Sequence, residues 1–276
     1  METAHQDRSL RTLLCLLMLA AVSSSCGGDG SGKAGTEALG TLQSGIRSTN
    51  YCGYQRAGSL AGFRKVGGTW IVPSVSTSDA DGGSSAWTGI GGGCSDPPDC
   101  TLIEPTLIQA GTEHDSTGGQ ATYFAWWEAL PGPAVEASGG PLGTETFDVQ
   151  PGDRITVSID GSSLVLWNID IVDTRDGATH WTFHTTVPYV VAGTTAEWIA
   201  EAPLSIGTSG AGQLPLSDFG RISFFDLTQN GANPRLGESG NAFIMTNGAG
   251  DVVCNPSAAA ASGDAFTACS GSEPCG

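Results

Sequence analysis

The sequence is short of basic residues. Its 276 residues include 28 Asp and Glu but only 11 Lys and Arg, of which Lys33 and Lys65 are the two lysines, and the formal net charge is −17. Nucleic acid and anionic membranes repel such a chain, so neither is expected as a partner. The composition also suits an acidic medium, because few fixed positive charges repel one another once the carboxylates are protonated. Acidity for solubility alone explains the same numbers.

The sequence also lacks a hydrophobic run long enough to span a membrane. The apolar run at residues 13–22 is ten residues long, whereas a spanning helix needs about 20. Two arginines precede it and small residues follow, which predicts a secretory signal peptide over residues 1–25. Cys26 stands where a bacterial lipoprotein signal places its acylated cysteine, although Ser23 occupies a position usually held by Leu, Val or Ile. Lipid attachment through Cys26 at the cell envelope and ordinary secretion both remain open.

Six cysteines remain after Cys15 in the signal and Cys26 are set aside. An even set in an exported chain favours up to three disulfides. We predict a local pair between Cys94 and Cys100 across the short segment SDPPD. The sequence leaves open the pairing of the other four, which are Cys52, Cys254, Cys269 and Cys275.

No segment has a convincing helical period. Residues 26–49 are rich in Gly, Ser, Thr and Ala and are expected to form a flexible tether. Residues 50–230 contain short runs rich in Val, Ile, Thr and aromatics, separated by Gly, Pro, Asp and Ser, which predict strands and turns. Evenly spaced strands over about 200 residues indicate one all-β sandwich or barrel. Residues 231–276 hold two further candidate strands, NAFIMTN and DAFTAC, and a cysteine-rich tail that completes the same domain.

A metal site is not expected. His180 and His184 are four residues apart, which in a strand separates them by about 13 Å, too far to share a zinc ion. Hydrogen-bonded or exposed histidines explain the pair better. We predict no metal and no cofactor.

Two predicted strands combine acids with aromatic side chains. Because side chains alternate along a strand, Glu197 and Glu201 lie on one face of AEWIAEAP. In YFAWWEAL, Glu128 shares a face with Trp126, and Trp127 points to the other face. Acids beside aromatics on a sheet can line a cleft for an extended polymer, either peptide or sugar. Solvated acids and core tryptophans explain each residue singly.

An uncharged amide, Gln109, lies within the short apolar run LIQAG, which predicts a buried strand. A buried amide without hydrogen-bond partners costs roughly 1–3 kcal/mol. Gln109 is therefore expected to be hydrogen-bonded or to take part in function.

The motifs NYCGY, AWTGIGG, LIQAG, YFAWWEALP, AEWIAEAP and LSDFGRISFFD occur in this order. With them the chain resembles the glutamic peptidases, or eqolisins, over most of residues 50–228. The resemblance implies a lectin-like sandwich of two curved antiparallel sheets and acid-acting endopeptidase activity. By motif it implies a catalytic dyad of Gln109 and Glu201, with Trp87 and Glu128 as supporting or substrate-contacting groups. We include Trp127, beside Glu128, among the candidate substrate contacts.

The resemblance implies that water attacks the peptide carbonyl, with Glu201 as general base and the Gln109 amide stabilising the oxyanion. Gly91 stands where many relatives have an acidic residue, which puts one acid of the site in doubt. The rival hypothesis is a carbohydrate-binding sandwich, or a glycosidase with Glu201 and Glu128 as its carboxylate pair. Under the peptidase hypothesis the partners are polypeptide substrates, and we expect a monomer.

Overall fold

The computed structural model describes residues 45–276, with gaps at 79, 140–144, 164, 208–209, 274 and 276. The predicted signal peptide, the candidate lipid site Cys26 and most of the predicted tether lie outside the described residues. Among the residues that are described, no helix is long and apolar enough to cross a membrane.

Fifteen strands form one continuous, almost entirely antiparallel sheet that folds into two layers. Its first layer contains, in spatial order, β12 (Ala178–Pro188), β11 (Leu166–Arg175), β10 (Arg154–Gly161), β3 (Lys65–Ile71), β16 (Arg221–Gln229) and β19 (Phe266–Ser270). Its second layer contains β2 (Tyr51–Ala57), β13 (Thr195–Glu201), β4 (Gly82–Gly91), β5 (Leu107–Thr117), β6 (Gln120–Ala129) and β7 (Val135–Glu136).

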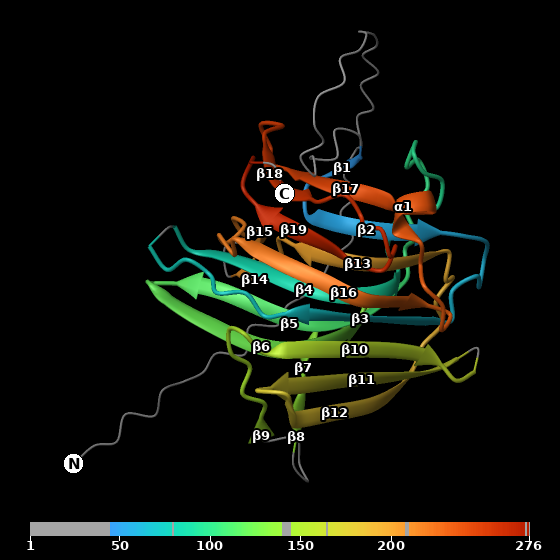
Figure 1. Cartoon of the computed structure of the whole chain (residues 1–276), viewed down its shortest axis with the longest axis horizontal. Coiled ribbons are helices and arrows are strands. Elements are labelled where there is room, and N and C mark those ends of the chain that lie inside the picture. The colour runs from blue at the N-terminus through green and yellow to red at the C-terminus, as the bar shows by residue number, and fades with distance from the viewer. Residues whose placement is uncertain are drawn as a thin grey trace, which may run out of the picture.

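The two layers are joined through β18 (Val252–Pro256) and β17 (Asn241–Thr246). Figure 1 shows these two strands at the top of the view and β10, β11 and β12 at the bottom. Strands β3 and β10 of the first layer contact β4 of the second. The predicted all-β sandwich is confirmed.

Small elements complete the described chain. The short pairs are β8 (Ser138–Gly139) with β9 (Glu145–Thr146) and β14 (Leu204–Gly207) with β15 (Gly210–Gln213). Helix α1 (Leu236–Ser239) is a single turn. Strand β1 (Ile46–Ser48) pairs in parallel with β17. The predicted tether therefore ends before residue 46, because Ile46 is buried and packs with the apolar residues of the sheet.

Strands β4 and β13, in the middle of the second layer, are buried on both faces, whereas β10 of the first layer has one partly solvated face. In β10 the residues Ile155, Val157 and Ile159 point into the core between the layers, as the alternation of RITVSI predicts. Every residue of β4 and β13 is buried. The second apolar cluster, which includes Trp87 and Trp126, covers the side of these strands away from the core.

Three disulfides tie the chain together. Cys94 bonds to Cys100, the local pair that the spacing predicts. Cys52 on β2 bonds to Cys254 on β18, and the third bond, Cys269 to Cys275, closes the end of the tail. Three such bonds are typical of chains that fold in an oxidising compartment.

Candidate active site

The side of the second layer that faces away from the sandwich core, here called the outer face, gathers the acids and the amide predicted from the sequence. Strands β6, β5, β4, β13 and β2 lie side by side in this order. Their registers align the outer-face residues in three transverse rows. None of these rows contains a basic residue.

The first row, called the glutamine row, contains Glu128, Gln109, Gly89, Glu197 and Gln55, one from each strand. Gln109 is fully buried, and its Nε2 donates to Oε2 of Glu128 at 2.7 Å. Its Oε1 atom has no hydrogen-bond partner among the described residues. The amide is therefore held at one end and open at the other.

Glu197, in the same row, is a fully buried acid. Neither of its carboxylate oxygens has a hydrogen-bond partner of ordinary geometry among the described residues. The backbone of Gly93 lies directly over it, since a Cβ added there would be 1.9 Å from Oε1. Burial raises the pKa of Glu197 well above its ordinary value, the Thr195 side chain opposes this shift, and the carboxylates of Glu104 and Glu201 add to it. The surroundings of Glu197 therefore favour its neutral form.

The second row, called the tryptophan row, contains Trp126, Gly111, Trp87, Ile199 and Gly53. Gly111 has to lack a side chain, because a Cβ there would be 2.6 Å from Cβ of Trp87. The indole Nε1 of Trp87 donates to Glu201 at 2.6 Å. This apolar row separates the two polar rows and links to one of them through the indole.

The third row, called the glutamate row, contains Phe124, Glu113, Ser85, Glu201 and Tyr51. Glu201 accepts a hydrogen bond on each oxygen, from Trp87 as above and from Nδ2 of Asn50 at 3.0 Å. Two N–H donors stabilise the ionised form of a carboxylate. Glu201 thus differs from Glu197 in its hydrogen bonding, although both glutamates lie on the same face of β13.

Glu113 stands across Ser85 from Glu201 in the glutamate row. It is almost fully buried. Burial raises the pKa of Glu113 well above its ordinary value, and the carboxylates of Asp115 and Glu201 add to the shift. Sequence reasoning did not single out Glu113 or Asn50. The signal for Glu113 is its place four residues after Gln109, on the same face of the same strand.

Gln109 and Glu201 therefore lie on one face, as predicted, but in different rows. Both pair with β4, Gln109 opposite Gly89 and Glu201 opposite Ser85. They are two strands apart across the sheet and four residues apart along it, with the tryptophan row between them. Of the other candidates, Trp87 and Glu128 are on this face and contact the two residues directly.

Trp127 is not brought to this site. It is partly buried and packs against the core cluster between the layers, on the opposite side of β6 from Glu128. Because side chains alternate along the strand, Trp127 points to the core side of β6 and its neighbour Trp126 points to the outer face.

Gly91 has a positive φ of 88° and no room for a side chain. A Cβ there would lie 2.0 Å from the carbonyl oxygen of Thr106 and 2.8 Å from Oε1 of Glu104. Glu104 is buried and accepts backbone N–H donors from Gly193 and Thr194, each at 2.8 Å. The path of this chain therefore excludes an acid at position 91 and brings the carboxylate of Glu104 close to that point.

The histidines lie elsewhere. His180 and His184 each contact an aspartate, Asp173 at 2.9 Å and Asp170 at 2.7 Å. His114 is buried on the core side of β5, and burial lowers its pKa to about 3. Within the described part of the chain, no group of His, Cys, Asp and Glu is arranged to hold a metal ion.

Comparison with known proteins identifies the family. The model of the Peptidase A4 family matches residues 49–268. The chain belongs to this family. It is 28% identical to aspergillopepsin-2 of Aspergillus niger over 241 residues, which cover 80% of this chain and 77% of that protein. The resemblance to the eqolisins is thus confirmed, and the protein is a glutamic endopeptidase that hydrolyses polypeptide substrates.

Solved structures support the fold. The crystal structure of scytalido-glutamic peptidase with a transition state analogue inhibitor has a TM-score of 0.64 at 19% identity. That alignment covers 81% of this chain and 98% of the other. SCP-B, a member of the eqolisin family in a complex with the tripeptide Ala-Ile-His, has a TM-score of 0.60 at 19% identity, with the same coverage. At this identity the likeness concerns the fold alone.

Proposed function

We propose that the A4 peptidase works in acid through a dyad of Gln109 and Glu201, with water as the nucleophile. Glu201 takes a proton from the water as it attacks the peptide carbonyl, and then gives a proton to the leaving amine. The Gln109 amide stabilises the oxyanion by hydrogen bonding. The observation that supports this assignment is the pair of donors on Glu201, an acid on the same face as Gln109.

Glu197 competes with Glu201 for the role of base, because it shares a row with Gln109. A general base has to be ionised at the working pH. The Trp87 and Asn50 donors favour an ionised Glu201. Glu197 has no donor of this kind, is covered by Gly93, and has a raised pKa. We therefore assign the base to Glu201 and a neutral, supporting role to Glu197.

The hydrogen bond to Glu128 gives Gln109 a fixed orientation. With one N–H donated to Glu128, the second N–H of the primary amide is left to bind an oxyanion, and Oε1 is left to accept from the attacking water. This assignment requires the scissile carbonyl to lie over the tryptophan row, between the side chains of Gln109 and Glu201. A primary amide does not titrate in acid, so it remains a donor throughout the working range.

An acidic pH optimum of activity is expected from the base itself and from the two buried acids near it. Glutamate has a reference pKa of about 4.3, which suits a base working near pH ~4. Glu113 and Glu197 have raised pKa values and are neutral there. As the pH rises they ionise and place unpaired negative charges beside Glu201. We therefore expect activity to fall towards neutrality.

The test is cleavage of unfolded casein across the pH range, with and without pepstatin. We expect cleavage that peaks near pH ~4 and resists this inhibitor of aspartic peptidases. Activity that is highest at pH ~7–8 would contradict the acid mechanism. Glycan binding without cleavage would instead favour the carbohydrate-binding hypothesis, against which the family membership already counts.

A further inference from the structure

The turn between β1 and β2 reaches the proposed base. Nδ2 of Asn50 in this turn donates to Oε1 of Glu201 at 3.0 Å, and Nε1 of Trp87 donates to Oε2. Trp87 lies on β4, within the sheet, whereas Asn50 follows the first strand that the structure describes. One of these two donors therefore depends on how the amino-terminal segment is held.

The Ser48 side chain fixes the orientation of the Asn50 amide. Its hydroxyl donates to Oδ1 of Asn50 at 3.2 Å and accepts from the backbone N–H groups of Asn50 and Tyr51, at 3.3 and 3.0 Å. Because Oδ1 accepts this proton, the amino group of the same amide is the end that points to Glu201. A hydroxyl group has one proton and two lone pairs, so the turn uses the full hydrogen-bonding capacity of Ser48.

Strand β1 holds Ser48 in place. It pairs in parallel with β17, Ile46 opposite Phe243 and Ser48 opposite Met245, and Figure 1 shows the two strands together at the top of the view. Ile46 is buried in the apolar cluster of the outer face that also contains Trp87. The match to the Peptidase A4 family begins at residue 49, so β1 and Ser48 lie ahead of the matched region.

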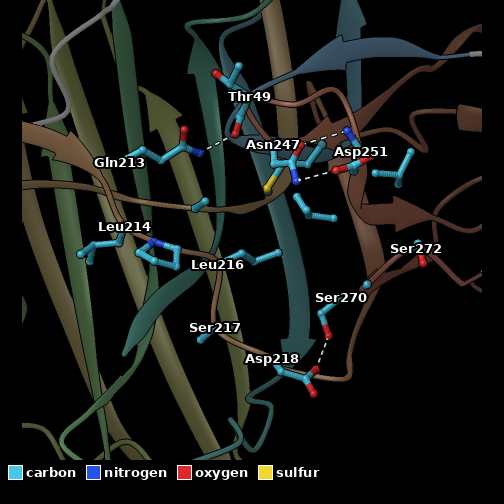
Figure 2. A pocket seen from close by; sticks show the side chains of 17 residues that line it. Thr49, Gln213, Leu214, Leu216, Ser217, Asp218, Asn247, Asp251, Ser270 and Ser272 are labelled. Carbon is cyan, nitrogen blue, oxygen red and sulfur yellow. Dashed lines mark hydrogen bonds between the residues drawn. The ribbon is translucent and has the colours of Figure 1, made fainter. Parts of the chain in front are cut away.

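The backbone of the turn is tied to the segments around the base. The carbonyl oxygen of Asn50 accepts from the N–H of Ala202, the residue after Glu201, at 2.9 Å. The carbonyl oxygen of Thr49 accepts from the side-chain amide of Gln213, as Figure 2 shows. These contacts, together with those of Ser48, hold the Asn50 amide beside the Glu201 carboxylate.

We propose that Asn50 is a positioning residue of the active site, and that β1 and Ser48 act on Glu201 through it. The hydrogen bond from Asn50 stabilises the ionised carboxylate, which is the form that a general base needs. Releasing β1 frees the amide and makes Glu201 harder to ionise, so activity is lost first at the acid end of the working range. This inference rests on the proposed function of Glu201 and adds the amino-terminal strand to the parts that support it.

Other titratable groups lie near Glu201. Those on the outer face are Tyr51, Glu113, Asp115, Glu128 and Glu197, and β1 carries Arg47. Burial raises the pKa values of Glu113 and Glu197 well above the ordinary value, so their titration falls on the basic side of the activity profile. All six groups are kept in the variants below. A difference between variants in the acid limb therefore reports the contact of Asn50 with Glu201.

The test is the pH dependence of kcat/KM between pH ~2 and ~6 on a capped peptide without Asp, Glu or His, so that the substrate does not titrate. Asn50→Ala should move the acid limb up by about one pH unit, roughly the worth of one hydrogen bond to a charged group, and leave kcat/KM at pH ~5 within about threefold. Asn233→Ala is the matched control, since it removes an exposed asparagine from the turn before α1. It should leave the limb in place.

Ile46→Ser and Ser48→Ala should move the acid limb in the same direction by a smaller amount, because Asn50 remains but is held less firmly. In the Asn50→Ala background neither should move it further, since both act through the Asn50 amide. A merely structural role would lower the thermal melt without moving the limb. Ser48→Ala keeps the test decisive if Ile46→Ser does not fold.

Coincident acid limbs for Asn50→Ala and the wild type would overturn the proposal. So would a shift by Ser48→Ala that adds in full to that of Asn50→Ala. Glu201→Gln on the same peptide separates these results from the proposed function. If it loses activity, the base assignment stands and only the role of Asn50 is rejected, whereas normal turnover would reject the base and the role of Asn50 together.

Discussion

Buried acids have different kinds of partner in two regions of this molecule. On the outer face, Glu113 and Glu197 are buried without a cation, and Glu201 is held by an indole and an amide. On the first layer, around β10 and β11, the buried Asp153 accepts two hydrogen bonds from the Arg175 guanidinium, at 2.7 and 2.8 Å. The two regions use the same kind of side chain for different purposes.

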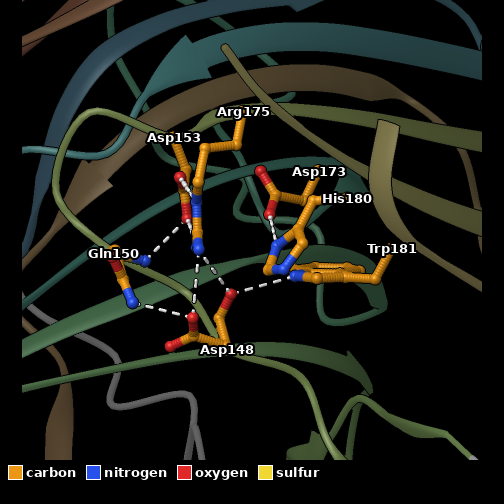
Figure 3. A network of polar contacts seen from close by, with 7 residues as sticks. All are labelled: Asp148, Gln150, Asp153, Asp173, Arg175, His180 and Trp181. Carbon is orange, nitrogen blue, oxygen red and sulfur yellow. Dashed lines mark hydrogen bonds and ion pairs between the residues drawn. The ribbon is translucent and has the colours of Figure 1, made fainter. Parts of the chain in front are cut away.

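Figure 3 shows the second arrangement, here called the arginine network. Arg175 also binds Asp148 at 3.1 Å, and the Trp181 indole donates to the Asp148 carbonyl oxygen at 3.1 Å. Next to it, His180 contacts the buried Asp173 at 2.9 Å. These contacts fix the segment before β10 to β11 and β12. Arginine accompanies the buried acid that ties these strands together, whereas the acids of the candidate active site have no cation beside them among the described residues, which suits the proposed mixture of neutral and ionised carboxyls.

The largest expected effect separates the two glutamates of β13. Glu201→Gln should reduce kcat/KM by about 10²–10⁴-fold, the usual contribution of a general base. Glu197→Gln should leave it within about tenfold, because an amide replaces an acid that is already neutral. The measurement is peptide hydrolysis at pH ~4, with far-UV spectra and thermal melts to show that both variants fold. The reverse ranking would move the base to Glu197.

The next effect concerns the amide. Gln109→Ala should reduce kcat by about 10²–10³-fold, the typical loss of one oxyanion donor. Glu128→Gln should cost less, because it changes only the group that orients the amide. Both are measured on the same peptide, with the thermal melt as control. Near-normal turnover by Gln109→Ala would exclude this residue from the dyad.

Much of the outer face could be predicted from the sequence, because alternation along a strand assigns each side chain to a face. Alternation predicts that Glu128 shares a face with Trp126, and that Glu197 and Glu201 share one face of their strand. Strand β2 was harder to predict, since Gly53 interrupts its pattern. The structure explains that glycine, because a Cβ there would lie 2.2 Å from the carbonyl oxygen of Trp198.

The rows of the site could not be predicted in this way. Strands β5 and β13 lie on either side of β4. Which of their residues share a row depends on the register of both strand pairs, and the pattern of a single strand does not determine that register. The register places Gln109 and Glu201 in different rows and puts Glu113 in the same row as Glu201.

A smaller effect is expected in the arginine network, and on stability rather than on activity. Arg175→Met should lower the free energy of unfolding by about 2 kcal/mol, because Asp153 remains buried without its cation while the partial exposure of Arg175 limits the loss. His184→Gln is the control, since both partners of its pair are largely exposed. Denaturant unfolding at pH ~6 gives both values. Equal stability of the two variants would show that the network is not a stabilising device.

The smallest effect is a change of slope with pH, and it has opposite signs in the two regions. The folded-state pKa of Glu197 is raised above the ordinary value of 4.5, so its contribution to stability is complete below that pH and is lost as the pH rises. The folded-state pKa of Asp148 is lowered below 3.8, first by its hydrogen bond from Gln150, so its contribution is present above that value and is lost as the pH falls. Glu197→Gln should therefore flatten the decline in the free energy of unfolding as the pH rises above about 4.5, by at most about 1.4 kcal/mol per pH unit, and the Tm measured at each pH reports this change. Asp148→Asn should flatten only the decline below pH ~4. Parallel Tm curves for Glu197→Gln and the wild type would mean that Glu197 is already ionised in the folded state, and it would then again compete with Glu201 as the base.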